Sequence, residues 1–324
     1  MKLIATRNYP LSVGLALGLL FLFIAIWGPS LAPHDPLQAF SDVLFIGDKT
    51  YIPTRTPLPP FALEQFFLGT DNAGRDLYSR LLWAVRPTLI LTMIIVTVRM
   101  AVGLLLGLLA GWYVGRLSER FVDILIGVSL AVPVLLFALA AISFIGDKTL
   151  PTFILALTVT GWANTAVFVK NNTRTIMQAA YIEGARAIGV KPLGILRRHI
   201  LPQLWPVLPS LIAFELGTVM LLIAELGFLG MFIGDAYILM GESANSAGTV
   251  AVGITSGTPE LAQMLSDFWS KMIRAPWEIV IVGLTVFFQI FTFNLLGEGW
   301  RRHMDITRPR RFSLRHRRQR EPDL

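Results

Sequence analysis

Few residues of this chain have a type and spacing that could support catalysis or bind a metal ion. There is no cysteine, and the four histidines are scattered, at positions 34, 199, 303 and 316. A thiolate nucleophile or metal site is therefore excluded, and a histidine cluster is not expected. No nucleophile–base pair, pair of carboxylates or dinucleotide-binding glycine motif has a usable spacing. We predict no catalytic residue and no metal ligand, so the chain moves or anchors something.

Three charged residues lie inside otherwise apolar segments. They are Arg99, Glu215 and Glu225. A charge near the middle of a bilayer is costly unless it is paired or faces a water-filled cavity. The sequence leaves three roles open for these side chains: a structural ion pair, the lining of a pore, or snorkelling toward the headgroups.

The composition is that of a membrane protein. Apolar residues make up 54% of the 324 residues, charged residues only 15%, and the mean hydropathy is +0.62. Soluble proteins carry about 25% charged residues, so this chain has too few charges to cover a water-facing surface. Disordered chains have low hydrophobicity, which excludes that class too. We predict an all-α integral membrane protein.

Six apolar segments are long enough to cross a bilayer, which takes about 20 helical residues. The predicted spans are 11–31, 87–115, 124–146, 149–169, 203–234 and 279–297. The first could instead be a signal peptide, but its apolar run is longer than a signal core and Pro33 follows it, which favours a retained helix. Within the second span, Gly103, Gly107, Gly111 and Gly115 recur every four residues, a pattern typical of close helix packing.

The distribution of Lys and Arg predicts the orientation of the spans. If the N-terminus is cytoplasmic, the internal segments 1–10, 116–123, 170–202 and 299–324 hold 19 of the 28 basic residues. Both termini are therefore predicted to be cytoplasmic. The last segment alone carries +6 of the net charge of +7. Such a basic tail beside a membrane favours contact with anionic lipid or a partner protein over nucleic acid.

The chain divides into three predicted parts. Residues 1–86 hold the first helix and an external loop, 87–300 form a five-helix core, and 301–324 are the basic cytoplasmic tail. The external stretch 32–62 is rich in proline and is predicted to be an irregular loop. The external stretch 241–258 is rich in Gly, Ser, Ala and Thr, which is typical of a flexible insertion.

The internal loop 170–202 is predicted to form two short amphipathic helices. Residues 175–188 are mostly good helix formers, and Gly189 permits the left-handed turn that ends a helix. Pro192 suits the first turn of a second helix, in which Leu193, Leu196 and Ile200 would share one face. Two such helices would make a compact knob on the cytoplasmic side. Interfacial helices that rest on lipid headgroups are the alternative.

This loop resembles the "EAA" loop of bacterial ABC-importer permeases. The resemblance rests on Glu183-Gly184-Ala185, on Gly189 four residues after Ala185, and on Leu201-Pro202, with Gly184 in place of the usual alanine. The stretch from His199 to Pro202 is similar to the dipeptide, oligopeptide and nickel branch, and to its C-type subunit. The residues that the resemblance assigns to ATPase coupling are Glu183, Gly184, Ala185, Ala187, Ile188, Gly189, Leu201 and Pro202.

Other stretches resemble the same branch, and together they cover nearly the whole chain. Residues 32–36, 224–230, 258–265 and 294–301 match it, with Glu298 where the family usually has aspartate. An external motif precedes the second span and consists of Gly69, Thr70, Asp71, Gly74, Arg75, Asp76, Ser79 and Arg80. Residues 235–257 have no evident counterpart in the family.

The resemblance implies a type I ABC-importer permease fold of six transmembrane helices in a bacterial or archaeal cytoplasmic membrane. Such a permease forms half of a pore with a second homologous permease, and works by alternating access. Two cytoplasmic ATPases, which bind ATP and Mg²⁺, drive it through the EAA loop, and an external solute-binding protein delivers the solute. We expect no cofactor on this chain itself, since Walker motifs are absent.

A self-contained secondary transporter or channel is the rival hypothesis. Arg99 and the two glutamates would then be its ion-coupling groups. Such transporters often show inverted repeats and broken helices, and the sequence contains no such halves. The solute stays open at this point, because peptides, nickel chelates and oligosaccharides are all imported by permeases of this appearance.

Overall fold

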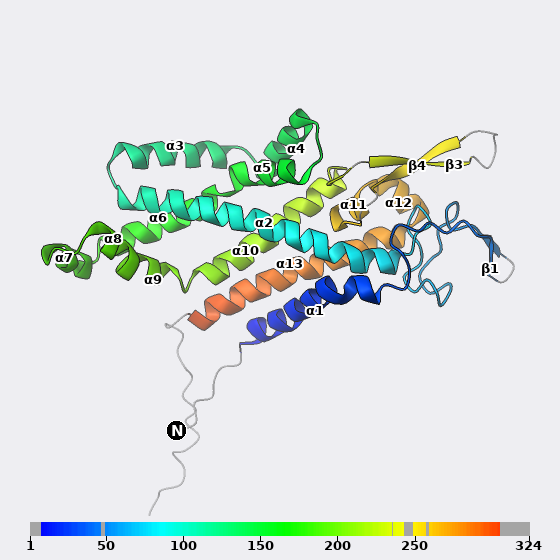
Figure 1. The fold of residues 1–324 in the computed structure, drawn as a ribbon, viewed down its shortest axis with the longest axis horizontal. Coiled ribbons are helices and arrows are strands. Elements are labelled where there is room, and N and C mark those ends of the chain that lie inside the picture. The colour runs from blue at the N-terminus through cyan, green and yellow to red at the C-terminus, as the bar shows by residue number, and fades with distance from the viewer. Residues whose placement is uncertain (1–7, 47–48, 235, 243–248, 257–258, 305–324) are drawn as a thin grey trace, which may run out of the picture.

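The computed structural model describes residues 8–46, 49–234, 236–242, 249–256 and 259–304. Most helices run along the long axis of the molecule, so the connecting segments gather at its two ends (Figure 1). The predicted contact of the tail 305–324 with lipid lies outside these described residues.

Four helices are each long and apolar enough to cross a membrane. They are α1 (Tyr9–Leu31), α2 (Leu77–Trp112), α10 (Leu208–Phe228) and α13 (Pro276–Met304). Helix α1 packs against α13, and the two backbones approach closely where Gly14 and Gly299 lack a Cβ atom. The four corresponding spans of the sequence prediction are confirmed.

The other two predicted spans are broken helices. Helices α3 (Leu117–Ala131) and α4 (Val134–Ile145) meet at a bend of 87°. Pro133 explains the break, since proline lacks an N–H and disfavours the helical conformation at the residue before it; Val132 is extended, with φ −103° and ψ 125°. Helices α5 (Leu150–Gly161) and α6 (Ala163–Met177) are bent by 45°. Counting each bent pair as one span gives the six expected.

The glycine stripe of α2 brings this helix against α6. A Cβ atom on Gly103, Gly107 or Gly111 would collide with the side chains or carbonyl groups of α6. Gly115 differs, because it lies in the turn after the helix with a φ of +79°, and a Cβ atom there would meet no other atom. Three of the four glycines therefore pack helices, as the pattern predicts, and the fourth makes a turn.

In the described part of the chain, the segments predicted to be internal lie toward one end of the molecule and those of the two long external segments lie at the other (Figure 1). The first end carries four short elements: α7 (Ala180–Ala187), α8 (Pro192–Ile195), a π-helix (Leu196–Ile200) and α9 (Leu201–Leu204). The opposite end carries α11 (Leu261–Leu265), α12 (Phe268–Arg274) and two β-hairpins.

The hairpins correct two expectations about the external loops. Strands β1 (Leu44–Ile46) and β2 (Lys49–Tyr51) pair inside the stretch expected to be irregular. Strands β3 (Ala236–Glu242) and β4 (Thr249–Ser256) pair antiparallel, with an irregularity between Leu239 and Met240. The flexible insertion predicted for 241–258 is therefore wrong for the residues of β4, where valine, isoleucine and threonine favour a strand.

Candidate functional site

The loop 170–202, predicted to be internal, folds into the predicted knob, which we define as residues 180–204. Helix α7 ends in a Schellman motif, in which Val190 N–H donates to the Ala185 carbonyl and Gly189 N–H donates to the Arg186 carbonyl. Gly189 has a φ of +82°, so the predicted left-handed turn is confirmed. A β-branched residue would be strained in this conformation.

The second half of the knob is a helix with one wide turn. The N–H of Leu201 bonds to the carbonyl of Leu196, five residues back. Pro202 lacks an N–H and its ring clashes with the preceding turn of a regular helix, which explains the π-turn here. The extra residue in the π-turn changes which side chains share a face of the helix. The predicted common face of Leu193, Leu196 and Ile200 is therefore wrong for Leu193. Leu193 is 74% exposed, while Ile195 and Ile200 are buried.

An apolar cluster holds the knob to helix α6. Its buried members are Val169, Ile176, Ile182, Ile195, Ile200 and Leu204. The Gln203 amide also donates to the Tyr181 hydroxyl, at 2.6 Å. Val169 and Ile176 of this cluster belong to α6, so the knob and α6 form one packed unit.

The residues assigned to coupling lie mostly on the outer surface of this knob. Ala185 is buried against the cluster. The seven others are exposed: Glu183, Gly184, Ala187, Ile188, Gly189, Leu201 and Pro202. Ile188 is 82% exposed and Leu193 is 74% exposed. The knob thus exposes two large apolar side chains and the Glu183 carboxylate, on a backbone fixed by the Gly189 turn.

The three charges in the membrane segments separate into a pair and a single residue. Arg99 Nη1 lies 2.7 Å from Glu215 Oε1, joining α2 to α10. The same guanidinium donates to the Leu157 carbonyl through Nε, at 2.8 Å, and through Nη2, at 2.5 Å. Gly161 leaves room for it, because a Cβ atom there would collide with the guanidinium. Arg99 therefore fills the break between α5 and α6.

Glu225 lies apart from this pair, in the last turn of α10. It is half-buried, and within the described part of the chain its carboxylate has no hydrogen bond or ion pair. It lines a concavity of about 400 Å³ together with Leu135, Ala224, Phe228, Leu229 and Leu265. The walls of this concavity are otherwise apolar.

The external motif forms a buried charge network at the start of α2. Asp71 Oδ2 lies 2.8 Å from Arg75 Nε and 3.2 Å from Arg80 Nε, and Arg80 also donates to Gln263 at 2.7 Å. Burial alone would raise the pKa of Asp71. The Arg75 and Arg80 guanidinium groups, the Arg75 amide and Lys271 together outweigh burial and lower that pKa.

The rest of the motif shapes the turn that enters α2. Asp76 is the N-cap of the helix, and its carboxylate accepts from the amide and hydroxyl of Ser79. Thr70 accepts from the amide of Leu58 at 2.8 Å. Gly69 and Gly74 have φ values of +75° and +78° and lie directly against neighbouring backbone. All eight residues of the motif are buried, so they shape the start of α2 and do not form a surface.

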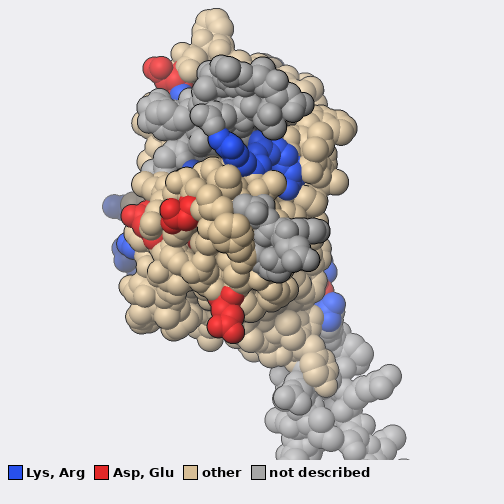
Figure 2. All heavy atoms as spheres, turned by 90° about the vertical axis from the view of Figure 1, so that its right-hand side faces the viewer, with Lys and Arg blue, Asp and Glu red and all other residues tan. Residues whose placement is uncertain are grey.

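Sequence reasoning missed the groups from the C-terminal third that complete this network. Lys271 Nζ lies 2.8 Å from Glu278 Oε1, and Glu278 Oε2 accepts from the amide of Asn72 at 3.1 Å. Nothing local marks these residues as members of the network, because Asn72, which Glu278 contacts, lies 206 positions away in the sequence. Seen end-on from the hairpin side, Lys and Arg side chains gather in one patch near the middle of the face (Figure 2).

Glu260 is a second missed carboxyl at this end of the molecule, outside the four long spanning helices. It is 6% exposed, and its Oε2 accepts from the amide of Ile233 at 3.3 Å. Burial raises the pKa of Glu260 to about 7, which the hydrogen bond offsets only in part.

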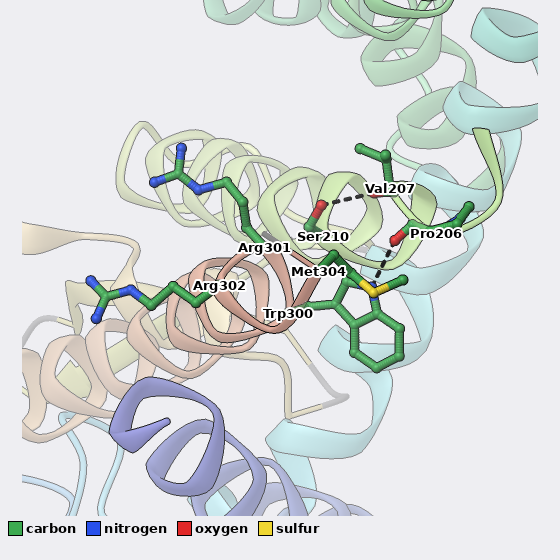
Figure 3. A pocket seen from close by; sticks show the side chains of 7 residues that line it. All are labelled: Pro206, Val207, Ser210, Trp300, Arg301, Arg302 and Met304. Atoms are coloured by element: carbon green, nitrogen blue, oxygen red, sulfur yellow. Dashed lines mark hydrogen bonds between the residues drawn. The ribbon is translucent and has the colours of Figure 1, made fainter. Parts of the chain in front are cut away.

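A pocket of about 400 Å³ lies at the other end, where α10 begins and α13 ends. The Trp300 indole donates to the Pro206 carbonyl at 2.8 Å and links the two helices. Arg301 and Arg302 point away from the indole and both pair with Glu298 (Figure 3). The family-like stretch 294–301 thus fastens the end of α13 to the start of α10. Among the described residues, no group of three His, Asp or Glu could hold a metal ion.

Comparisons with known proteins agree on one family. The family described as "Binding-protein-dependent transport system inner membrane component" matches residues 103–296. The di/tripeptide transport system permease protein DppC of Pseudomonas aeruginosa (strain UCBPP-PA14) is 30% identical over 90% of this chain and 86% of its own length. The glutathione transport system permease protein GsiD of Escherichia coli (strain UTI89 / UPEC) is 31% identical over 89% of this chain and 83% of its own.

A solved structure is similar in fold. It is the inward-facing MetNI methionine ABC transporter, with a TM-score of 0.50 and 20% sequence identity. The match covers 69% of this chain and 95% of the other. This likeness concerns the arrangement of the helices.

Proposed function

Because the chain belongs to the family of binding-protein-dependent transport system inner membrane components, we propose that it forms one half of the pore of an importer for small peptides. The chain is a multi-pass permease subunit of an ATP-driven importer in the inner membrane, and not an enzyme. ATPase and binding-protein partners belong to such a system. Family membership decides against the self-contained secondary transporter or channel.

The shape of the knob is the observation that carries the coupling proposal. It is packed onto α6, its backbone is fixed by the Gly189 turn, and it exposes Ile188, Leu193 and Glu183. An exposed apolar tip on a rigid mount suits insertion into a cleft of a partner protein. We assign that partner as the ATPase, and two ATPases and a second permease complete the assembly. ATP and Mg²⁺ then belong to the ATPases.

The proposed orientation follows from the same assignment. The knob end faces the cytoplasm, and so do the start of α1 and the end of α13, which lie at that end (Figure 1). The end with the two hairpins then faces the binding protein. The excess of Lys and Arg in the segments of the knob end supports this direction.

Peptides are the proposed solute, since two relatives that match about nine-tenths of the chain carry the names of di/tripeptide and glutathione transporters. Transport would proceed by alternating access, in which ATP binding and hydrolysis move the knob. The pore would form between this chain and the second permease.

Reconstituted transport tests this proposal. The complete complex in proteoliposomes, with its binding protein, should take up labelled di- and tripeptides only when ATP is present. Omission of the binding protein or of ATP is the control and should abolish uptake. Uptake of an oligosaccharide with no uptake of any peptide would contradict the peptide assignment.

A further inference from the structure

The environment of the Glu225 carboxylate differs from that of Glu215 on the same helix. It is half-buried in the last turn of α10, inside the concavity that Leu135, Phe228, Leu229 and Leu265 otherwise make apolar. Glu215 lies ten residues earlier on the same helix, and its charge is neutralised by the ion pair with Arg99. Glu225 has no such partner among the residues that the structure describes. A carboxylate in a membrane helix that is not paired faces a water-filled cavity or a cation from elsewhere.

The helix itself strengthens the demand for a cation. The C-terminal end of a helix carries partial negative charge, so a carboxylate in its last turn is unfavourable on its own. Lys148 donates to the Gly230 carbonyl at 3.1 Å, just beyond this helix end, and lies over the Phe232 ring. Among the described residues no ion pair joins it to Glu225, so the carboxylate keeps its charge without a paired cation.

The backbone around the carboxylate is fixed. Gly230 has a φ of +79°, and Met231 N–H donates to the Leu226 carbonyl at 2.8 Å, which closes the end of α10. On the other side, Gly227 lies so close to Ala262 that a Cβ atom would not fit, which holds α11 against the helix. The carboxylate is thus presented from a rigid support.

We propose that Glu225 binds the α-ammonium group of the transported peptide, while the apolar walls accept its first side chain. An ammonium group has three N–H donors and needs few acceptors, which one carboxylate and nearby water supply. A Ca²⁺ or Mg²⁺ ion needs about six oxygen ligands, and these walls lack them. The proposal rests on the proposed peptide import and names the group that the permease recognises.

Peptides with and without the charged amine test the proposal directly. Binding of a labelled dipeptide and of its N-acetylated form is measured on the purified complex without binding protein, so that only the permeases select. The wild-type complex should prefer the free amine by about tenfold or more, the size of one charge-assisted hydrogen bond. Glu225→Gln should remove most of this preference, and Glu225→Asp should retain part of it. Glu64→Gln, which changes an exposed external carboxyl, is the control and should bind as wild type.

Three results would overturn the inference. An unchanged preference in Glu225→Gln would do so, with peptide import by the wild type leaving the proposed function intact. Loss of the second permease from purified Glu225→Gln complex would assign the carboxylate to a basic group of that partner instead. A wild-type complex that imports no peptide would overturn the proposed function and this inference together.

Discussion

The Arg99 guanidinium compensates two groups at once, the Glu215 carboxylate and the Leu157 carbonyl. The sequence predicted that this charge needs compensation, but it could not select Glu215 over Glu225. The two positions of the pair are 116 residues apart, and only the packing of α2, α5 and α10 brings them together. For the same reason, only the structure shows that Glu225 has no charged partner among the residues it describes.

We predict that Arg99→Ala destabilises the permease more than the double change Arg99→Ala with Glu215→Ala. The single change leaves a buried carboxylate without its cation, which costs about 3 kcal/mol or more, whereas the double change removes both charges. Thermal unfolding of the purified protein in detergent measures the difference. Arg86→Ala, at an exposed position of the same helix, is the control. Strictly additive effects of the two alanines would contradict the pairing.

We predict that Glu260 makes the protein less stable as the pH rises from about 4.5 to about 7. The folded protein holds its proton up to a pKa of about 7, while the unfolded chain releases it near 4.5. Stability from this group is therefore complete below pH 4.5 and is lost up to pH 7, by about 3 kcal/mol at roughly 1.4 kcal/mol per unit.

Melting temperatures of wild type and Glu260→Gln between pH 5 and 8 test this. The glutamine should flatten the pH dependence and keep the hydrogen bond from Ile233. The lowered pKa of Asp71 acts in the opposite direction and only below its ordinary value of 3.8, so it does not affect this range. Identical pH profiles for the two proteins would disprove the assignment.

At the scale of elements, the long apolar runs of the sequence are enough to predict the membrane-spanning segments. They are not enough to predict the two bends, which depend on single residues. Pro133 marks the break between α3 and α4 in the sequence itself. The break between α5 and α6 contains no proline, and the Arg99 guanidinium of α2 occupies the space that Gly161 leaves there. The sequence of the β3–β4 region does not predict a hairpin, because its glycine and serine residues favour a flexible segment over a strand at 249–256.

We predict that Gly189→Val uncouples transport and leaves the helices inserted. Valine at a φ of +82° costs about 1 kcal/mol or more and displaces the turn that presents Ile188. Stimulation of ATPase activity by loaded binding protein should fall or disappear. Gly194→Ala, in the right-handed second helix where only the Val190 side chain lies close, is the control. Full stimulation in Gly189→Val would refute the coupling role.

We predict that Gly107→Ala destabilises the contact between α2 and α6 by about 1–3 kcal/mol, the usual cost of overpacking. Its new Cβ atom would lie about 2.6 Å from the Ala166 carbonyl oxygen. Gly127→Ala is the matched control, because a Cβ atom on that helical glycine meets nothing. The melting temperature should fall in the first variant only, and equal values would contradict close packing at Gly107.

At the scale of the whole molecule, the two ends are chemically different, and this difference predicts the topology. The chain has no cysteine, so single-cysteine variants need no altered background. Ser41→Cys should react with an impermeant thiol reagent in intact cells, and Lys191→Cys only after the membrane is opened. The reverse pattern would invert the proposed orientation.

The bend between α5 and α6 has a mechanical consequence. The buried residues of α6 near the knob share their cluster with it, whereas Phe153, Ala156 and Leu157 of α5 share theirs with α2, α4 and α10. A displacement of the knob should therefore be transmitted first to α6, and through the close contacts at Gly103, Gly107 and Gly111 to α2, before it reaches the cluster that holds α5.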